Sequence, residues 1–165
     1  MFPGGARTVC RHRCVGVAVW GRPRATLDID FLVMVDAKEL DRLGARMARV
    51  GMEVDEAWLE WNPTLRGSLL RLHDQEVTVD VLRPRDPHDH QIFRRRVKKR
   101  LEGRVYWFVA PEDFILQKLK VGRPRDFEDT LTVLERSGAP LNRAYLRRWA
   151  ARLHITGELR YVLSL

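Results

Sequence analysis

The stretch Gly21–Val33, GRPRATLDIDFLV, places two aspartates at the head of a strongly apolar run. Odd-numbered residues from 27 to 35 are all apolar, and this alternation predicts a β-strand over 26–35. The last residues of this strand are apolar on both faces, which is typical of a central strand covered on both sides. Carboxylates rarely enter such a strand without a partner that offsets their desolvation. We therefore expect Asp28 and Asp30 to have a partner that offsets the desolvation of their charges.

Asp28 and Asp30 point to the same side of the predicted strand, because side chains alternate between the two faces. Two like charges so placed repel each other unless a cation or a proton neutralises them. Hard oxygen ligands favour Mg²⁺, with Mn²⁺ as the alternative ion. A pair of aspartates near a strand end can also simply face solvent, and this alternative stays open.

Asp80 lies in a second valine-rich strand, predicted over 76–82, where VTVDVL alternates in the same way. If the two strands are neighbours, Asp80 joins Asp28 and Asp30. Three carboxylates can hold two metal ions, one at the attacking oxygen and one on a triphosphate. Asp80 alone can also be a solvent-facing residue.

The rest of the pattern predicts an α+β chain, with a small mixed sheet flanked by helices and then C-terminal helices. Asp36 is placed to cap the first helix, and Pro111 to begin a later one. The other predicted elements are a helix over 37–50, strands over 67–73 and 76–82 joined by a hairpin, a polar helix over 89–101, a strand over 104–109, and two or three helices after the one that Pro111 begins.

The length of 165 residues predicts a single domain. We expect residues 1–13 to be loosely ordered, 14–110 to form the sheet-bearing core and 111–165 to be helical. No run reaches the roughly 18 apolar residues of a membrane span, so we expect no membrane partner. Cys10 and Cys14 are the only cysteines, which favours a cytoplasmic protein with reduced thiols.

The net charge of +8 and the pI near 10.2 indicate a polyanionic partner such as a nucleoside triphosphate, a nucleic acid or an acidic protein. The densest basic stretch is RRRVKKR, Arg94–Arg100. One interpretation is a solvated helix face. The other is a patch that contacts a phosphate backbone.

The segment VGVAVWGRPRATLDIDFLV resembles the signature of the minimal, polymerase-beta-like nucleotidyltransferases. In that superfamily a glycine turn is followed by Asp-apolar-Asp on a strand and by a third Asp on a later strand. Gly16, the pair Asp28 and Asp30, and Asp80 occupy these positions. The resemblance implies a nucleotidyltransferase fold in which the glycine turn approaches a triphosphate.

The stretch Arg24–Asp30 has the form Arg-x-Thr-x-Asp-Ile-Asp, which includes Arg24 and Thr26. This form resembles a segment of AbiEii-type toxins and their uncharacterised prokaryotic relatives. Such relatives also have a later segment like Pro111–Leu134, where Lys118 and Arg123 match recurring basic positions. The resemblance covers roughly residues 14–155. It implies that Gly16, Arg24, Thr26, Lys118 and Arg123 bind the nucleotide.

Each of these assignments has a structural alternative. Lys118 can be a snorkelling residue on a partly buried helix face. Arg123 can pair with Asp126 and Asp129. Arg24 can be held by the carboxylates for structure, and Thr26 fits an ordinary strand position.

The resemblance implies an enzyme that moves a nucleoside monophosphate from an NTP to a hydroxyl of RNA, such as a tRNA end, or of a protein. Mg²⁺ or Mn²⁺ at Asp28, Asp30 and Asp80 would be its cofactor. The resemblance also suggests that the chain is the toxin of a toxin–antitoxin pair, with an antitoxin protein as its partner. The position after Gly16 is Val17 rather than Gly or Ser. The alternative function is therefore a catalytically weakened module that binds nucleic acid or a partner protein.

Overall fold

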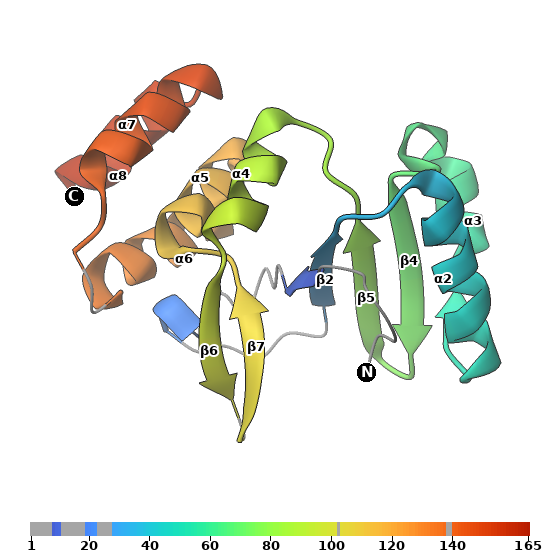
Figure 1. The fold of residues 1–165 in the computed structure, drawn as a ribbon. Coiled ribbons are helices and arrows are strands. Elements are labelled where there is room, and N and C mark those ends of the chain that lie inside the picture. Colours follow the sequence, from blue (N-terminus) through green and yellow to red (C-terminus); the bar gives the residue numbers. More distant parts are fainter. Residues whose placement is uncertain (1–7, 11–18, 23–27, 102, 138–139) are drawn as a thin grey trace. The chain divides into compact units, whose positions relative to one another are not determined.

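The computed structural model describes residues 8–10, 19–22, 28–101, 103–137 and 140–165 (Figure 1). The chain divides into two compact units. Unit 1 comprises the described residues of 1–13 and 25–108, and unit 2 those of 14–24 and 109–165. Unit 1 contains the strands and unit 2 is helical, so the predicted α+β class is confirmed.

The strands of unit 1 lie in the order β3-β4-β5-β2-β1-β7-β6. Four of them, β3, β4, β5 and β2, form one part of the sheet, while β6 and β7 form a hairpin (Figure 1). The short β1 pairs with β2 and with β7. The bounds are β1 Thr8–Cys10, β2 Asp28–Val33, β3 Glu53–Val54, β4 Leu69–Asp74, β5 Val77–Leu82, β6 Val97–Leu101 and β7 Arg104–Phe108.

The sheet is mixed because β2 and β5 are parallel, while β4 is antiparallel to β5 and to β3. The predicted hairpin joins β4 to β5. Its turn contains Gln75, whose φ of 53° is in the left-handed region. A parallel pair needs a crossover connection, and α2 (Ala37–Arg49), β3, α3 (Glu56–Trp61), the 3₁₀ turn η1 (Pro63–Leu65) and β4 lie between β2 and β5 in the chain.

The apolar face of this sheet packs against α2. Leu70, Leu72, Val79 and Val81 are buried there together with Leu40 of the helix. Alternating strand residues supply this core, so the intervening positions all lie on the opposite face. Helix α2 begins where predicted: the Asp36 side chain accepts from the backbone N–H of Glu39, and Glu39 accepts in return from that of Asp36.

One predicted element of unit 1 is wrong. The polar helix expected over 89–101 is helix α4, Pro87–Arg95, which ends before the basic stretch does. Residues 97–101 form β6 instead and pair with β7. Arg94–Arg100 is therefore not a solvated helix face, because its second half is a β-strand.

Among its described residues, unit 2 contains four helices after residue 110. As predicted, Pro111 begins α5 and two carboxylates follow in its first turn. Both carboxylates hold α7: Glu112 accepts the backbone N–H of Asn142 at 2.9 Å, and Tyr145 donates its hydroxyl hydrogen to Asp113. The helix bounds are α5 Pro111–Val121, α6 Pro124–Arg136, α7 Arg143–Arg152 and α8 Thr156–Ser164.

No helix among the described residues has the length and apolar character that crossing a membrane would require.

Candidate functional site

The strand register places the predicted carboxylates on one face of the sheet, opposite the face that packs on α2. Asp30 of β2 is the register partner of Asp80 on β5, and Asp80 is the partner of Arg71 on β4. Asp28, two residues before Asp30, lies on the same face. Asp30 is only 5% exposed, whereas Asp28 is exposed. The two aspartate-bearing strands are thus neighbours.

A second polar row lies beside the first. Asp28 is the register partner of Thr78, and Thr78 is the partner of His73 on β4. We call this set of two rows the polar face; its members are Asp28, Asp30, Arg71, His73, Thr78 and Asp80. The next row on the same face is apolar, with Leu32, Leu82 and Leu69 in register.

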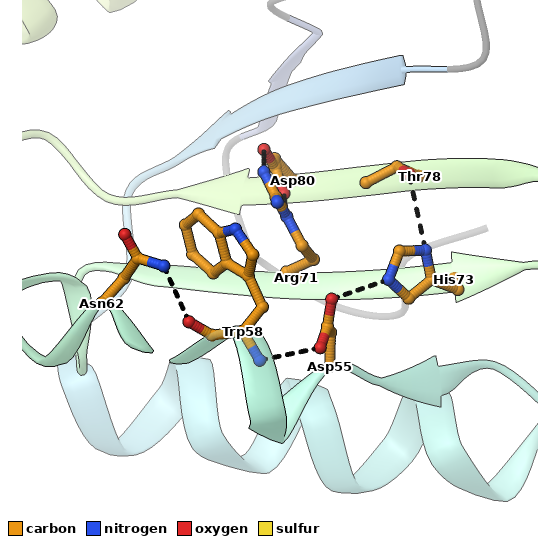
Figure 2. Close-up of polar contacts among 7 residues, drawn as sticks. All are labelled: Asp55, Trp58, Asn62, Arg71, His73, Thr78 and Asp80. Carbon is orange, nitrogen blue, oxygen red and sulfur yellow. Dashed lines mark hydrogen bonds and ion pairs between the residues drawn. The ribbon is translucent and has the colours of Figure 1, made fainter. Parts of the chain in front are cut away.

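Arg71 binds Asp80 through two parallel hydrogen bonds. Its Nε donates to Oδ1 at 2.8 Å and its Nη2 to Oδ2 at 2.7 Å (Figure 2). The guanidinium also stacks over the Trp58 ring of α3, 3.7 Å from its centroid. The hydrogen bond to Asp80 raises the pKa of Arg71 above its usual value, and the charges of Asp80, Asp55 and Asp28 act in the same direction. Arg71 is thus a fixed cation among carboxylates.

His73 joins a second chain of contacts on the polar face. Its Nε2 lies 2.9 Å from Oδ2 of Asp55, the N-cap of α3, and its Nδ1 lies 3.4 Å from Oγ1 of Thr78 (Figure 2). Because an ionised carboxylate only accepts, Nε2 is the donor in the first contact. The hydrogen bond from His73 lowers the pKa of Asp55, and the backbone N–H of Trp58 adds to the effect.

The chemistry of this face suits a hard divalent cation in part. Asp28 and Asp30 offer carboxylate oxygens from adjacent positions on one strand face, and Mg²⁺ is commonly held by one or two carboxylates together with substrate phosphates. In the part of the chain that the structure describes, no group of three or more His, Cys, Asp or Glu side chains is arranged to hold a metal ion. Asp80 instead has both oxygens on Arg71, although each keeps a lone pair that the guanidinium does not use.

Three of the predicted nucleotide-binding residues, Gly16, Arg24 and Thr26, lie outside the described residues. Their assignment stays a prediction.

Lys118 lies in unit 2 and does not snorkel to solvent. Its Nζ is buried between Asp126 at 3.0 Å and Asp129 at 2.6 Å. Asp126 and Asp129 thus pair with Lys118 rather than with the side chain of Arg123. Arg123 is the N-cap of α6, and its backbone N–H donates to Asp126 at 3.3 Å. The roles of Lys118 and Arg123 in nucleotide binding stay predictions.

Sequence reasoning missed Arg71, which binds Asp80, and the contact between His73 and Asp55. The available signal was the hairpin. Once β4 and β5 are paired across a tight turn, Arg71 falls opposite Asp80 and His73 opposite Thr78.

No known family model matches this chain, and no curated protein is significantly similar to it in sequence.

Proposed function

We propose that this chain is a Mg²⁺-dependent nucleotidyltransferase. It would move a nucleoside monophosphate from an NTP to a hydroxyl of an RNA such as a tRNA end, or of a protein. The observation that supports the proposal is the register of two parallel neighbouring strands, which sets Asp30 beside Asp80 with Asp28 on the same face. This arrangement agrees with the Asp-Ile-Asp pattern and the later Asp of the superfamily that the sequence resembles.

In this proposal Asp28 and Asp30 hold the metal ion, Mg²⁺ or Mn²⁺. When bound, the ion neutralises charge on the triphosphate oxygens. The acceptor oxygen forms a bond to the α-phosphorus, the bond to the bridging oxygen of the β-phosphate breaks, and pyrophosphate leaves. Asp80, which has lone pairs not used by Arg71, accepts the proton of the acceptor hydroxyl.

Arg71 has a supporting role in the same proposal. Its guanidinium offsets repulsion among the three carboxylates and fixes the orientation of Asp80, because a bidentate pair allows one geometry. Stacking on Trp58 in turn fixes Arg71. Arg71 is a positioning residue, since it acts through Asp80.

Label transfer from NTPs radioactive at the α-phosphate tests this function. The full chain is incubated with Mg²⁺, each labelled NTP, and either total tRNA or the protein itself as acceptor. We expect labelled product from the unaltered chain and none from Asp28→Ala. The matched control is Asp74→Ala, an exposed aspartate at the end of β4, which should transfer label normally. Unchanged transfer in Asp28→Ala would contradict the mechanism.

The second candidate is a binding module with the same fold and weakened catalysis. The contact that favours it is the Arg71–Asp80 pair, which occupies the carboxylate that a second metal ion would need. Such a module would bind nucleic acid or a partner protein, including an antitoxin. It predicts no label transfer from any NTP, in the unaltered chain as in Asp28→Ala.

A further inference from the structure

The β6–β7 hairpin, whose two strands lie side by side in Figure 1, combines basic and aromatic residues. Most of its residues are exposed, including Tyr106 at 40% and Trp107 at 36%. Glu102 is the one acidic residue of the segment 94–107. The cationic residues of that segment are Arg94, Arg95, Arg96, Lys98, Lys99, Arg100 and Arg104. A segment with seven cationic residues and one acidic residue attracts polyanions.

The hairpin register sorts these cations by face. Lys98 is the partner of Trp107, and Arg100 is the partner of Val105. Lys98 lies over the Trp107 ring, with Nζ 4.9 Å from the centroid. We call this side the basic face, and it consists of Arg96, Lys98, Arg100, Val105 and Trp107. Alternate residues of a strand are about 6.7 Å apart, so its cations form a straight row.

Arg96 anchors the basic face at the root of the hairpin. Its guanidinium lies between two rings, 4.3 Å from the centroid of Phe93 on α4 and 4.5 Å from that of Trp107. It also donates to the backbone carbonyl of Phe93. Trp107 is therefore held in place while part of its surface is open, and the exposed cations beside it are Lys98 and Arg100.

The opposite side of the hairpin differs in character. Val97 is the partner of Phe108, and Lys99 is the partner of Tyr106. Tyr106 and Phe108 make an edge-to-face contact with centroids 6.5 Å apart, and Phe108 is buried. This side continues into packed apolar residues, so it offers a shorter row of cations. Its exposed cations are Lys99 and Arg104.

We propose that the basic face binds single-stranded RNA, with phosphates on Lys98 and Arg100 and a base stacked on the part of Trp107 that Arg96 and Lys98 leave exposed. A row of cations beside a fixed aromatic ring is the pairing that single strands use, because their bases are free to stack. A duplex hides the faces of its bases and would leave Trp107 without that role. The choice of RNA rests on the proposed function, in which an RNA hydroxyl is the acceptor.

Fluorescence anisotropy of a labelled single-stranded RNA of about 20 nucleotides tests the inference, since this exceeds the roughly 4–16 nucleotides that one OB-fold module covers. Binding is measured in EDTA without NTP, so a protein that lacks transferase activity still gives a signal. Lys98→Ala/Arg100→Ala should weaken binding and reduce the slope of log K against log salt by about 1.4. Lys99→Ala/Arg104→Ala removes the same charges from the opposite side and should bind nearly as the unaltered chain does.

Two further variants test the stacking. Trp107→Ala should weaken binding by roughly tenfold, and Trp107→Tyr should restore most of it, because a tyrosine ring also stacks. Asp74→Ala, at the exposed aspartate that ends β4, should bind normally. Because binding is measured in EDTA without NTP, the assay separates this inference from the proposed function.

Several outcomes would overturn the inference. Equal loss in the two double variants would indicate diffuse attraction rather than a face. Tighter binding of a duplex, of single-stranded DNA or of anionic lipid vesicles would assign the hairpin to another partner. Failure of the unaltered chain to bind RNA would remove the inference while leaving label transfer to protein untouched.

Discussion

Among the described residues, each unit has carboxylates paired with a cationic side chain, and the two clusters differ in burial. In unit 2 the side chains of Lys118, Asp126 and Asp129 are all less than 10% exposed. In unit 1 the side chain of Arg71 is 22% exposed and that of Asp80 is 15% exposed. The polar face around them also includes Asp30 and the exposed Asp28.

The difference separates two uses of the same residue types. The buried cation joins α5 to α6 through two buried carboxylates, and removing it would leave those charges without compensation. The partly exposed cluster lies within reach of solvent, and the proposed function assigns a cation to it. The sequence motif alone does not show this difference in burial.

The largest expected effect is at Lys118. Replacing it by Met leaves Asp126 and Asp129 buried side by side, so Lys118→Met should lower the free energy of unfolding by about 3–5 kcal/mol. Urea denaturation measures the loss. Hydrogen exchange should locate it in α5 and α6 rather than in β4 and β5.

Lys120→Met is the control for that change, because Lys120 is exposed on the same helix. It should change stability by less than about 0.5 kcal/mol. Adding Asp126→Asn and Asp129→Asn to Lys118→Met should recover part of the loss. Normal stability of Lys118→Met alone would remove the contrast between the clusters.

A smaller effect is expected at Arg71. Because Asp80 is partly hydrated, Arg71→Met should lower the free energy of unfolding by about 1–3 kcal/mol. If the polar face takes a cation, Mg²⁺ should stabilise this variant more than it stabilises the unaltered chain, since the ion replaces the guanidinium. Thermal unfolding with and without Mg²⁺ measures both.

The exposed Arg66, also in unit 1, gives a matched Arg66→Met control. Mg²⁺ should stabilise Arg66→Met no more than it stabilises the unaltered chain. If Mg²⁺ gives Arg71→Met no additional stability, the view of the polar face as a cation site is contradicted.

The smallest effect concerns Asp55. The contact with His73 lowers the pKa of Asp55 in the folded chain. The pair therefore stabilises the fold at pH values above the ordinary carboxyl pKa of 3.8, and this stabilisation is lost as the pH falls through the pKa of the folded chain. Asp55→Asn keeps an N-cap acceptor. It should therefore be less stable by under about 1 kcal/mol at neutral pH and equal to the unaltered chain in strong acid.

Denaturant titrations across acidic pH measure this difference. Asp74→Asn, exposed at the end of β4, is the matched control. A gap between Asp55→Asn and the unaltered chain that widens in acid would reverse the assigned sign.

Local patterns predicted much of unit 1. Alternation identified β2 and β5, and Asp36 marked the start of α2. The helix predicted over 89–101 was wrong in its second half for a tertiary reason, because β6 gains its hydrogen bonds from β7. Gly103, with a φ of 77°, sits at the turn between them and was the local signal for a hairpin.

The candidate site was predictable only in its carboxylates. Asp28, Asp30 and Asp80 follow from two strand patterns, and the register that joins them agrees with the expectation that the strands are neighbours. No single sequence pattern predicts that Arg71 pairs with Asp80 or that Lys118 pairs with two aspartates. Each of these ion pairs depends on which helices and strands pack together. The sequence contains many charged residues, and it does not show which of them will be paired.

The most direct test of the polar face as a metal–nucleotide site is calorimetry. NTPs are titrated into the full chain with Mg²⁺ and, separately, with EDTA. We expect a heat of binding that requires Mg²⁺ and disappears in Asp30→Asn, a variant that keeps the shape of the side chain and removes its charge. Binding that persists in Asp30→Asn, or its absence from the unaltered chain with Mg²⁺, would contradict the account.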